Sequence, residues 1–520
     1  MTPPRPPAAG RLGGAPVVLL ALGVTVPPAV VAGARPLIFL GLGLLLLTFA
    51  AGYVTMARRM PHPAPLYCFV ARGLGRPFGL GAAGLALLSY TTLQLALYGA
   101  VGAAAAPLLA GWFGITVSWW VVALCCWAVV AGCGLLRVSV AAWLVAVLVL
   151  AEIVVIIGYG AANVLDPAGD GITWAALSPA SLADLPRPVL GLLLVGGALA
   201  FVGFETTAAF SDQPRHPHRA AYLCVAAIAV LTAAVGWAIS VAAGPGQLAP
   251  ADSGGIVPAG PGGIVSADPG QFLPGGPGGI VPADPGQVVA WGGARGPELM
   301  FDLAAERLAP WAVTLGRAML VVGLLAAMIA LHLVITRYLS ALGRERVLPP
   351  ALGRGAAASL TQTVVLGAVL GACAYADVGL GRGVGVAGGL GILALLPVTS
   401  LAALLFLNRN PGGAGVWGRF LAPALSTVGL GVLGYLAARD LPALLGVPVG
   451  RVWVWPAAAG AVVLLGIGYG LVLRRAAPVI YAGVGLGGVA VVVSPVSLPI
   501  PQPRNPGAHR PERINREVSH

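Results

Sequence analysis

One acidic side chain, Glu205, lies inside the apolar run Val189–Phe210 (VLGLLLVGGALAFVGFETTAAF). The run is long enough to cross a bilayer, because a helix rises about 1.5 Å per residue and the hydrocarbon core is about 30 Å thick. A carboxylate at that depth is costly against lipid, so Glu205 is expected to face protein or a water-filled cavity. Gly196, Gly197 and Gly203 weaken the helix and predict a break beside the acid. A carboxylate in such a place pairs with a cation or exchanges a proton.

Two further titratable side chains lie in apolar runs. Glu152, in VSVAAWLVAVLVLAEIVVIIGYG, either bonds a neighbouring helix or takes part in coupling to an ion. His332 has no acidic partner nearby in the sequence, and we favour a structural role for it over a proton relay. Glu205 has a plainer alternative as well, in which it reaches water near a helix end or hydrogen-bonds a neighbouring helix.

The composition indicates an integral membrane protein built of helices. Hydrophobic residues make up 58% of the 520 residues and charged residues 9%, against about 25% charged residues in soluble domains. Repeated apolar runs of about 20 residues favour helices over the short alternating strands of a barrel. The net charge of +12 does not indicate nucleic-acid binding, because the arginines lie in short loops and at the C-terminus. That distribution is typical of orientation by the positive-inside rule.

The apolar runs predict about twelve membrane spans, with both termini in the cytoplasm. They are expected at roughly 15–34, 36–57, 78–107, 115–136, 139–162, 188–210, 220–243, 309–336, 359–380, 384–407, 417–438 and 452–475. The chain then divides into a cytoplasmic N-terminal tail (1–14), helices 1–7 (15–243), an extracellular Gly/Pro-rich loop (244–296), helices 8–12 (297–475) and a cytoplasmic C-terminal tail (476–520). The loop repeats Pro-Gly at a spacing of eight residues with one missed copy, and is expected to hold no site.

Two shorter features accompany the first two spans. Pro27 and Pro28 fall in the middle of the first span and are expected to interrupt its hydrogen bonding, as a break or as a simple kink. After the second span, MPHPAPLYCFVARGLGRPFG predicts a proline-rich turn and a short amphipathic cytoplasmic helix, with Cys68 in a short loop.

The motifs of enzymes and cofactor sites are missing from the sequence. The cysteines show neither metal-ligand spacing nor a disulfide framework, and we interpret them as packing residues. Gly383–Gly388 matches GxGxxG, but no strand precedes it, so these glycines are expected to serve close helix packing. No HExxH, GxSxG or Walker motif occurs. We therefore expect no enzymatic activity, no cofactor and no metal.

Four stretches resemble the amino acid–polyamine–organocation (APC) superfamily, especially its actinobacterial amino acid permeases. They are GYVTMARRMPHPAPLYCFVARGLGRPFGLGAAGLALLSYTTLQLALYG (52–99), FVGFETTAAF (201–210), LHLVITRYLSALGRERVLPPALGR (331–354) and GRFLAPALSTVGLGVLGYLA (418–437). The resemblance covers both halves of the chain. It implies an all-α fold in which spans 1–5 and 6–10 form an inverted repeat, followed by two further helices.

The resemblance also implies discontinuous helices one and six that face each other at a substrate site near the membrane midplane. Half-helix N-termini there would hold a carboxylate, and unwound carbonyls with a nearby acid would receive an ammonium group. The matching substrate-binding residues are Thr25, Val26, Pro27, Pro28 and Ala29 on helix one and Phe201, Gly203, Phe204 and Glu205 on helix six. Glu205, Glu152 and His332 are the coupling candidates.

The function implied is secondary transport of an amino acid or related amine across the cytoplasmic membrane by alternating access. We expect protons to be the coupling ion, because two acids lie inside apolar spans and no ATP-binding motif occurs. The chain departs from the family after Gly33, where the connection to helix two is shorter, and in the glycine-containing break of helix one, replaced by Thr25–Pro28. These departures keep two alternatives open. One is a transport-deficient member acting as a membrane sensor or scaffold, and the other is a carrier of organic cations or polyamines.

Overall fold

The structure is a computed structural model that describes residues 14–29, 35–167, 171–183, 185–210, 219–243, 305 and 308–488. The predictions for the Gly/Pro-rich loop, for the tail before residue 14 and for the connection at 30–34 lie outside the described residues. Within them, every regular element is a helix, which confirms an all-α polytopic membrane protein.

The first half of the chain runs from α1 to η2. Its elements are α1 (Gly14–Ala29), α2 (Pro36–Arg59), α3 (Pro65–Gly73), α4 (Arg76–Phe113), α5 (Trp119–Gly134), α6 (Val138–Leu165), η1 (Ala175–Leu177), α7 (Ala180–Ala183), α8 (Arg187–Leu199) and η2 (Phe204–Phe210).

The second half runs from α9 to α17. Its elements are α9 (Ala220–Ala243), α11 (Pro310–Arg344), η3 (Pro350–Gly353), α12 (Gly355–Tyr375), α13 (Arg382–Arg409), the π-helical turn η4 (Trp417–Leu421), α14 (Ala422–Arg439), α15 (Leu441–Leu445), η5 (Val449–Arg451), α16 (Val454–Ala476) and α17 (Pro478–Gly483).

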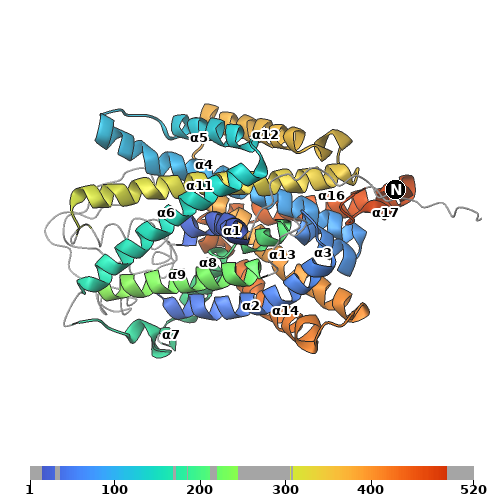
Figure 1. Cartoon of the computed structure of the whole chain (residues 1–520), viewed down its shortest axis with the longest axis horizontal. Coiled ribbons are helices and arrows are strands. Elements are labelled where there is room, and N and C mark those ends of the chain that lie inside the picture. Colours follow the sequence, from blue (N-terminus) through green and yellow to red (C-terminus); the bar gives the residue numbers. More distant parts are fainter. Residues whose placement is uncertain are drawn as a thin grey trace, which may run out of the picture.

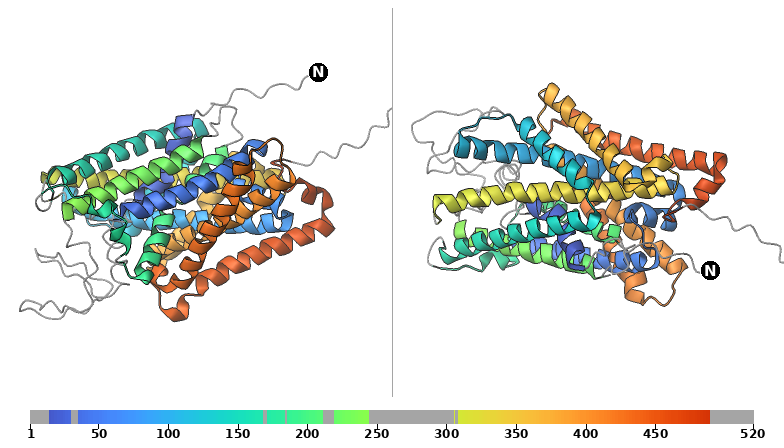
Figure 2. Two further views of the ribbon diagram at one scale, coloured as in Figure 1. Left: turned by 90° about the horizontal axis from the view of Figure 1, so that it is seen from below. Right: turned by 45° about the horizontal axis from the view of Figure 1, so that its top comes forward.

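The long helices lie side by side, roughly along the longest axis of the molecule (Figure 1), and two further views show the same arrangement (Figure 2). Ten described helical segments are long and apolar enough to cross a membrane, the segment Arg187–Phe210 counted as one. Two shorter apolar helices, Gly14–Thr25 within α1 and Trp119–Gly134 at α5, lie where the sequence predicts the first and fourth of its twelve spans. The bundle has an end marked by α3 and α17, here called the α3 end, and an opposite end marked by α7 (Figure 1).

The packing partners support the predicted five-plus-five repeat. Exchanging α1, α2, α4, α5 and α6 for α8–η2, α9, α11, α12 and α13 reproduces pairs of packed helices. Thus α4 packs against α13 as α11 packs against α6, and α5 packs against α4 as α12 packs against α11. If each of the first five helices crosses the membrane, the second set of five is inverted relative to the first, as the five-plus-five prediction requires.

Helices pack closely where glycines replace side chains, as predicted for Gly383–Gly388. A Cβ on Gly388 of α13 would lie 2.8 Å from the carbonyl oxygen of Ser89 in α4. A Cβ on Gly385 would lie 3.2 Å from the Cβ of Ala96 on the same helix. The glycines therefore permit the approach of two central helices of the bundle.

The segment between α2 and α4 is more deeply placed than its sequence predicts. The predicted short amphipathic helix is present as α3, and all of its residues except the exposed Arg72 are buried. Cys68, expected in a loop, lies in this helix and is buried. The contacts that cover α3 come from α4 and α13, and α13 lies far from it in the sequence.

Candidate functional site

The predicted helix break beside Glu205 is present. The α-helical hydrogen bonding of α8 ends at Leu199, a turn spans residues 200–203, and a 3-10 helix begins at Phe204. Gly203 has a φ of +122°, and a Cβ there would lie 2.6 Å from Val24 Cγ1 and 2.8 Å from Thr25 Cγ2. Only glycine fits this backbone and this close approach to α1.

Glu205 turns back on the break and is fully buried. Its Oε2 accepts the Gly203 N–H at 2.8 Å, and its Oε1 accepts the hydroxyl of Tyr90, on α4, at 2.8 Å. Its backbone carbonyl accepts the hydroxyl of Tyr53, on α2, at 2.8 Å. Glu205 therefore does not reach water. It does bond a neighbouring helix, as one of the two alternatives predicts, and it satisfies a backbone group that the break frees.

Aromatic rings enclose this carboxyl group from several helices. The Tyr90 ring meets that of Tyr338, from α11, edge-on at 5.7 Å between centroids. The ring of Phe204 meets Phe49 of α2 edge-on at 5.7 Å. Both tyrosines and both phenylalanines are at most 1% exposed. Electron-rich ring faces and a carboxylate are groups that attract an organic cation.

The helix-one part of the predicted site is described incompletely. The Thr25 side chain is buried, and its hydroxyl donates to the Leu22 carbonyl of its own helix at 3.0 Å. Val26, Pro27, Pro28 and Ala29 continue the helical backbone of α1, and their side chains lie outside the description. The two prolines therefore lie in the last described turn of α1. How the chain continues after Ala29 lies outside the described residues.

The remaining predicted site residues flank the break. Phe201 lies in the turn and is buried, with its ring 6.5 Å from that of Phe39 on α2. Phe204 begins η2 and is also buried. The structure thus brings Thr25, Phe201, Gly203 and Glu205 to one crossing of α1, α2 and the broken helix. Their role in binding stays a prediction.

Glu152 occupies a different crossing. It is 3% exposed on α6, and its carboxyl group lies directly against Gly323 of α11, where any Cβ would overlap it. Its Oε2 has no hydrogen-bond partner in the part of the chain that the structure describes. One turn earlier, Val149 packs on Gly23 of α1. Glu152 therefore lies where α6, α11 and α1 meet.

His332 joins three helices through hydrogen bonds that involve neither glutamate. Its Nε2 lies 2.8 Å from the hydroxyl oxygen of Ser359, on α12, and that hydroxyl donates to the Gly134 carbonyl of α5 at 3.2 Å. Because the serine proton is given to the carbonyl, the imidazole donates to the serine. This geometry supports the structural interpretation of His332.

The residues that the sequence interpretation missed are the hydroxyl donors to Glu205. Tyr90 lies within SYTTLQLALY, a run with several polar side chains inside a predicted span, and that polarity was the available signal. Tyr53 carries no comparable signal, because a single tyrosine in an apolar helix is common at helix contacts and membrane interfaces.

No family model matches the chain, and no curated protein matches it. Among the described residues, no group of three histidine, cysteine or acidic side chains could hold a metal ion.

Proposed function

We propose that the chain is a secondary transporter that moves an amino acid or related amine across the cytoplasmic membrane by alternating access, coupled to protons. The observation that carries the proposal is the broken helix at Gly203 with Glu205 buried beside α1. Freed backbone groups at membrane depth are tolerated only inside protein or along a cavity. Broken helices that present such groups with a charged side chain are the way many carriers build a midplane site.

We distinguish two groups of helices that pack among themselves, with α1, α2, α8–η2 and α9 in one group and α4, α5, α11 and α12 in the other. The groups also contact each other, because α1 packs against α11. In the proposed cycle the two groups move against each other. Hydrogen bonds join the two groups at the helix break and in η2, which follows it. Tyr90 donates to Glu205, and the Arg337 Nε of α11 donates to the Ala209 carbonyl at 2.8 Å. The Arg337 guanidinium also lies over the Phe210 ring, 4.7 Å from its centroid.

The first bond lies at the break and the second lies between the break and the α3 end, and we infer that the structure corresponds to a form closed at that end. Arginines gather at the same end, among them Arg58, Arg59, Arg72, Arg76, Arg344, Arg346, Arg354, Arg409, Arg474 and Arg475. From the positive-inside rule we infer that this is the cytoplasmic end. In the proposed cycle, cytoplasmic opening breaks the bonds that cross between the two groups.

The two glutamates divide the chemistry. Glu205 supplies a negative charge, and the aromatic rings packed near it supply electron-rich faces, so that together they receive a substrate amine. Glu152, buried with an oxygen that lacks a partner, is the candidate for the coupled proton, since a buried carboxyl group is less costly when neutral. The same features would suit an organic cation without a carboxylate, so polyamines belong among the substrates tested.

The experiment measures uptake of labelled amino acids and polyamines into proteoliposomes, with and without a pH gradient. Gly203→Ala is expected to lower uptake by about tenfold or more, because strain of about 1–3 kcal/mol falls on the site. Gly196→Ala, in the same helix with open space around it, is the matched control and is expected to keep uptake. Melting temperatures of both variants check folding.

A competent assay in which the unaltered protein moves no member of the panel would contradict the proposal. That result would favour the sensor or scaffold alternative.

A further inference from the structure

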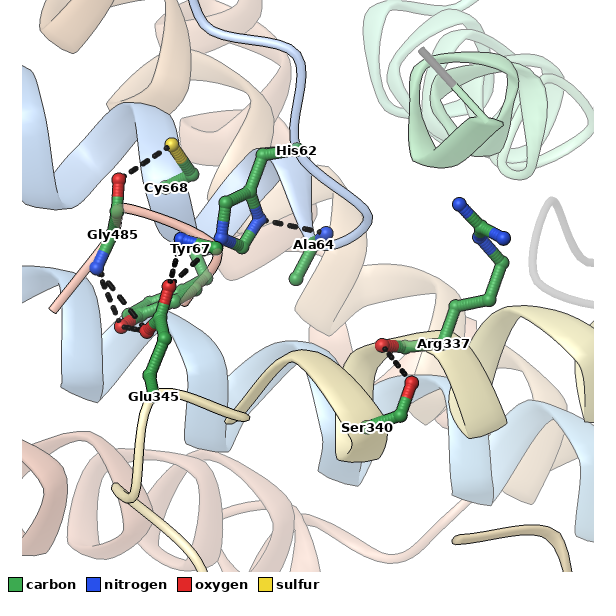
Figure 3. A network of polar contacts seen from close by, with 9 residues as sticks. His62, Ala64, Tyr67, Cys68, Arg337, Ser340, Glu345 and Gly485 are labelled. Atoms are coloured by element: carbon green, nitrogen blue, oxygen red, sulfur yellow. Dashed lines mark hydrogen bonds and ion pairs between the residues drawn. The ribbon is translucent and has the colours of Figure 1, made fainter. Parts of the chain in front are cut away.

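The chain continues past its last membrane helix into a segment that docks on the α3 end. After α16, α17 ends at Gly483 and residues 484–488 form a turn, which we call the C-terminal turn. Gly485 has a φ of +76° and Gly487 a φ of +78°. The Gly487 N–H donates to Glu345 Oε1 at 2.7 Å. The Gly485 N–H is shared between the Tyr67 hydroxyl oxygen at 2.9 Å and Glu345 Oε2 at 3.2 Å (Figure 3). Successive amides converging in this way form an anion-binding nest.

The receiving carboxylate, Glu345, follows the last residue of α11 and is 1% exposed. It also accepts the Tyr67 hydroxyl and lies 2.9 Å from His62 Nε2. The His62 Nδ1 accepts the Ala64 N–H at 2.9 Å, so Nε2 carries the proton that is donated to Glu345 (Figure 3). Burial raises the pKa of Glu345, but the hydrogen bonds from His62, Tyr67 and Gly487 outweigh it and hold the pKa below its ordinary value.

Side chains of α3 and α4 hold the rest of the docked segment. The Cys68 thiol lies 3.4 Å from the Gly485 carbonyl oxygen, to which it donates. Burial raises the pKa of this thiol and keeps it protonated as a donor. The Arg76 Nη2 donates to the Ala482 carbonyl at 3.2 Å, and its guanidinium lies 5.2 Å from the centre of the Tyr481 ring. Val484 is fully buried, so the turn is part of the packed structure.

This contact spans the two helix groups. His62 lies in the connection that directly follows α2, whereas Glu345 follows α11. The hydrogen bond between them therefore joins the cytoplasmic ends of helices that belong to different groups. Glu345 binds the C-terminal turn with the same two oxygens, so the turn stabilises the carboxylate that makes the joint.

We propose that the C-terminal turn is an intramolecular latch: its glycine nest binds Glu345, holds the ends of α2 and α11 together, and must leave when the cytoplasmic end opens. The inference rests on the proposed function for its place in a transport cycle. Its docking and gating, however, are measurable without any transported substrate.

The test uses two thiol reporters in the full chain, each as the single cysteine, labelled with N-ethylmaleimide. The first reporter is native Cys68, which the turn covers. The second is Thr207→Cys in η2, a buried position between the break and the α3 end. For the first reporter, five cysteines are replaced by alanine: Cys125, Cys126, Cys133, Cys224 and Cys373. For the second reporter, the same five cysteines and Cys68 are replaced by alanine.

Two variants attack the contact from opposite sides. Glu345→Gln removes the charge that the nest binds, and Gly487→Ala strains the nest, although a Cβ there keeps an ordinary 3.5 Å contact with His62 Cδ2. Each is expected to speed labelling of Cys68 by about tenfold or more, as for loss of a hydrogen bond to a charged group. Labelling at position 207 is expected to rise in the same variants. Gly488→Ala, next in the chain, is the matched control and is expected to keep both slow rates, because a Cβ there would meet no atom of the described residues within 4 Å.

Unchanged Cys68 labelling in both folded variants would overturn the docking role of the nest. Faster Cys68 labelling with no change at position 207 would show that the turn docks without holding the end closed, and would overturn the latch. Melting temperatures identify a variant that fails to fold, and the other variant then decides. Since labelling needs no substrate, failure of the transport proposal in the uptake assay is seen separately.

Discussion

Glu205 and Glu152 are both buried glutamates in membrane-spanning parts of the chain, and their surroundings differ in one respect. Both oxygens of Glu205 accept hydrogen bonds, one from a tyrosine of another helix and one from the amide of its own helix break. Glu152 has an oxygen without a partner among the described residues and a carboxyl group pressed against a glycine. The first arrangement stabilises an irregular backbone. The second leaves a costly group without structural compensation, which favours a role in function.

The largest expected effect comes from removing the charge of Glu205. Glu205→Gln keeps the side-chain size and can still accept the Gly203 N–H, so folding is expected to persist. If the charge receives the substrate amine, uptake falls by about tenfold or more, equivalent to about 1.4 kcal/mol. Uptake is compared at matched membrane abundance. Wild-type uptake with unchanged pH dependence would reduce Glu205 to a helix-bonding group, since such intramembrane bonds average about 0.6 kcal/mol.

Glu152→Gln separates coupling from binding. Because the Glu152 Oε2 has no hydrogen-bond partner among the described residues, replacing it breaks no such bond. The melting temperature of Glu152→Gln is therefore expected to equal or exceed that of the wild type. Accumulation driven by a pH gradient is expected to fall by about tenfold, whereas exchange of substrate without a gradient is kept. Glu205→Gln, in contrast, lowers both. A Glu152→Gln protein that still accumulates substrate in response to the gradient would assign the proton elsewhere.

The close contact between the Glu152 carboxyl group and Gly323 predicts a measurable effect on the stability of the folded protein. Gly323→Ala is expected to destabilise the protein by about 1–3 kcal/mol, because the new Cβ overlaps the carboxyl group. Adding Glu152→Ala removes the overlap, so the double variant should recover part of the loss in thermal unfolding. Gly158→Ala, on α6 with open space around it, is the control. Equal losses in the single and double variants would mean that the two residues are not in contact.

Glu345, like Glu205, is a buried glutamate whose two carboxylate oxygens both accept hydrogen bonds, but it lies outside the membrane-spanning segments. It therefore tests how much such a carboxylate stabilises the folded protein there. Its pKa lies below the ordinary value, so its carboxylate stabilises the folded protein above the unfolded pKa of about 4.3, and this is lost as the pH falls through the folded pKa. The difference in melting temperature between wild type and Glu345→Gln should therefore be largest at neutral pH. It should disappear once the pH falls below the folded pKa of Glu345. Asp440→Asn, which breaks a partly exposed ion pair with Arg439, should change the melting temperature little. A gap that persists in acid would contradict the carboxylate's role.

The sequence by itself determined the fold class and the region of the break. High apolar content and repeated long runs require a helical membrane protein, because only helices satisfy their backbone groups within one such run. Glycines followed by an acid inside an apolar run located the break, since glycine weakens a helix and a lipid-facing carboxylate is costly. These are local properties, readable within about one helix length.

Tertiary structure alone decided what each polar group does. Tyr90 and Glu205 lie 115 residues apart, and His62 and Glu345 lie 283 apart, so neither pair leaves a local pattern. Burial of α3 and docking of the C-terminal turn likewise depend on surfaces supplied by other helices, and the sequence predicted an amphipathic helix and a tail there. A glycine-rich run has no amphipathic periodicity of its own. It became a nest because folding placed a buried carboxylate opposite its amides.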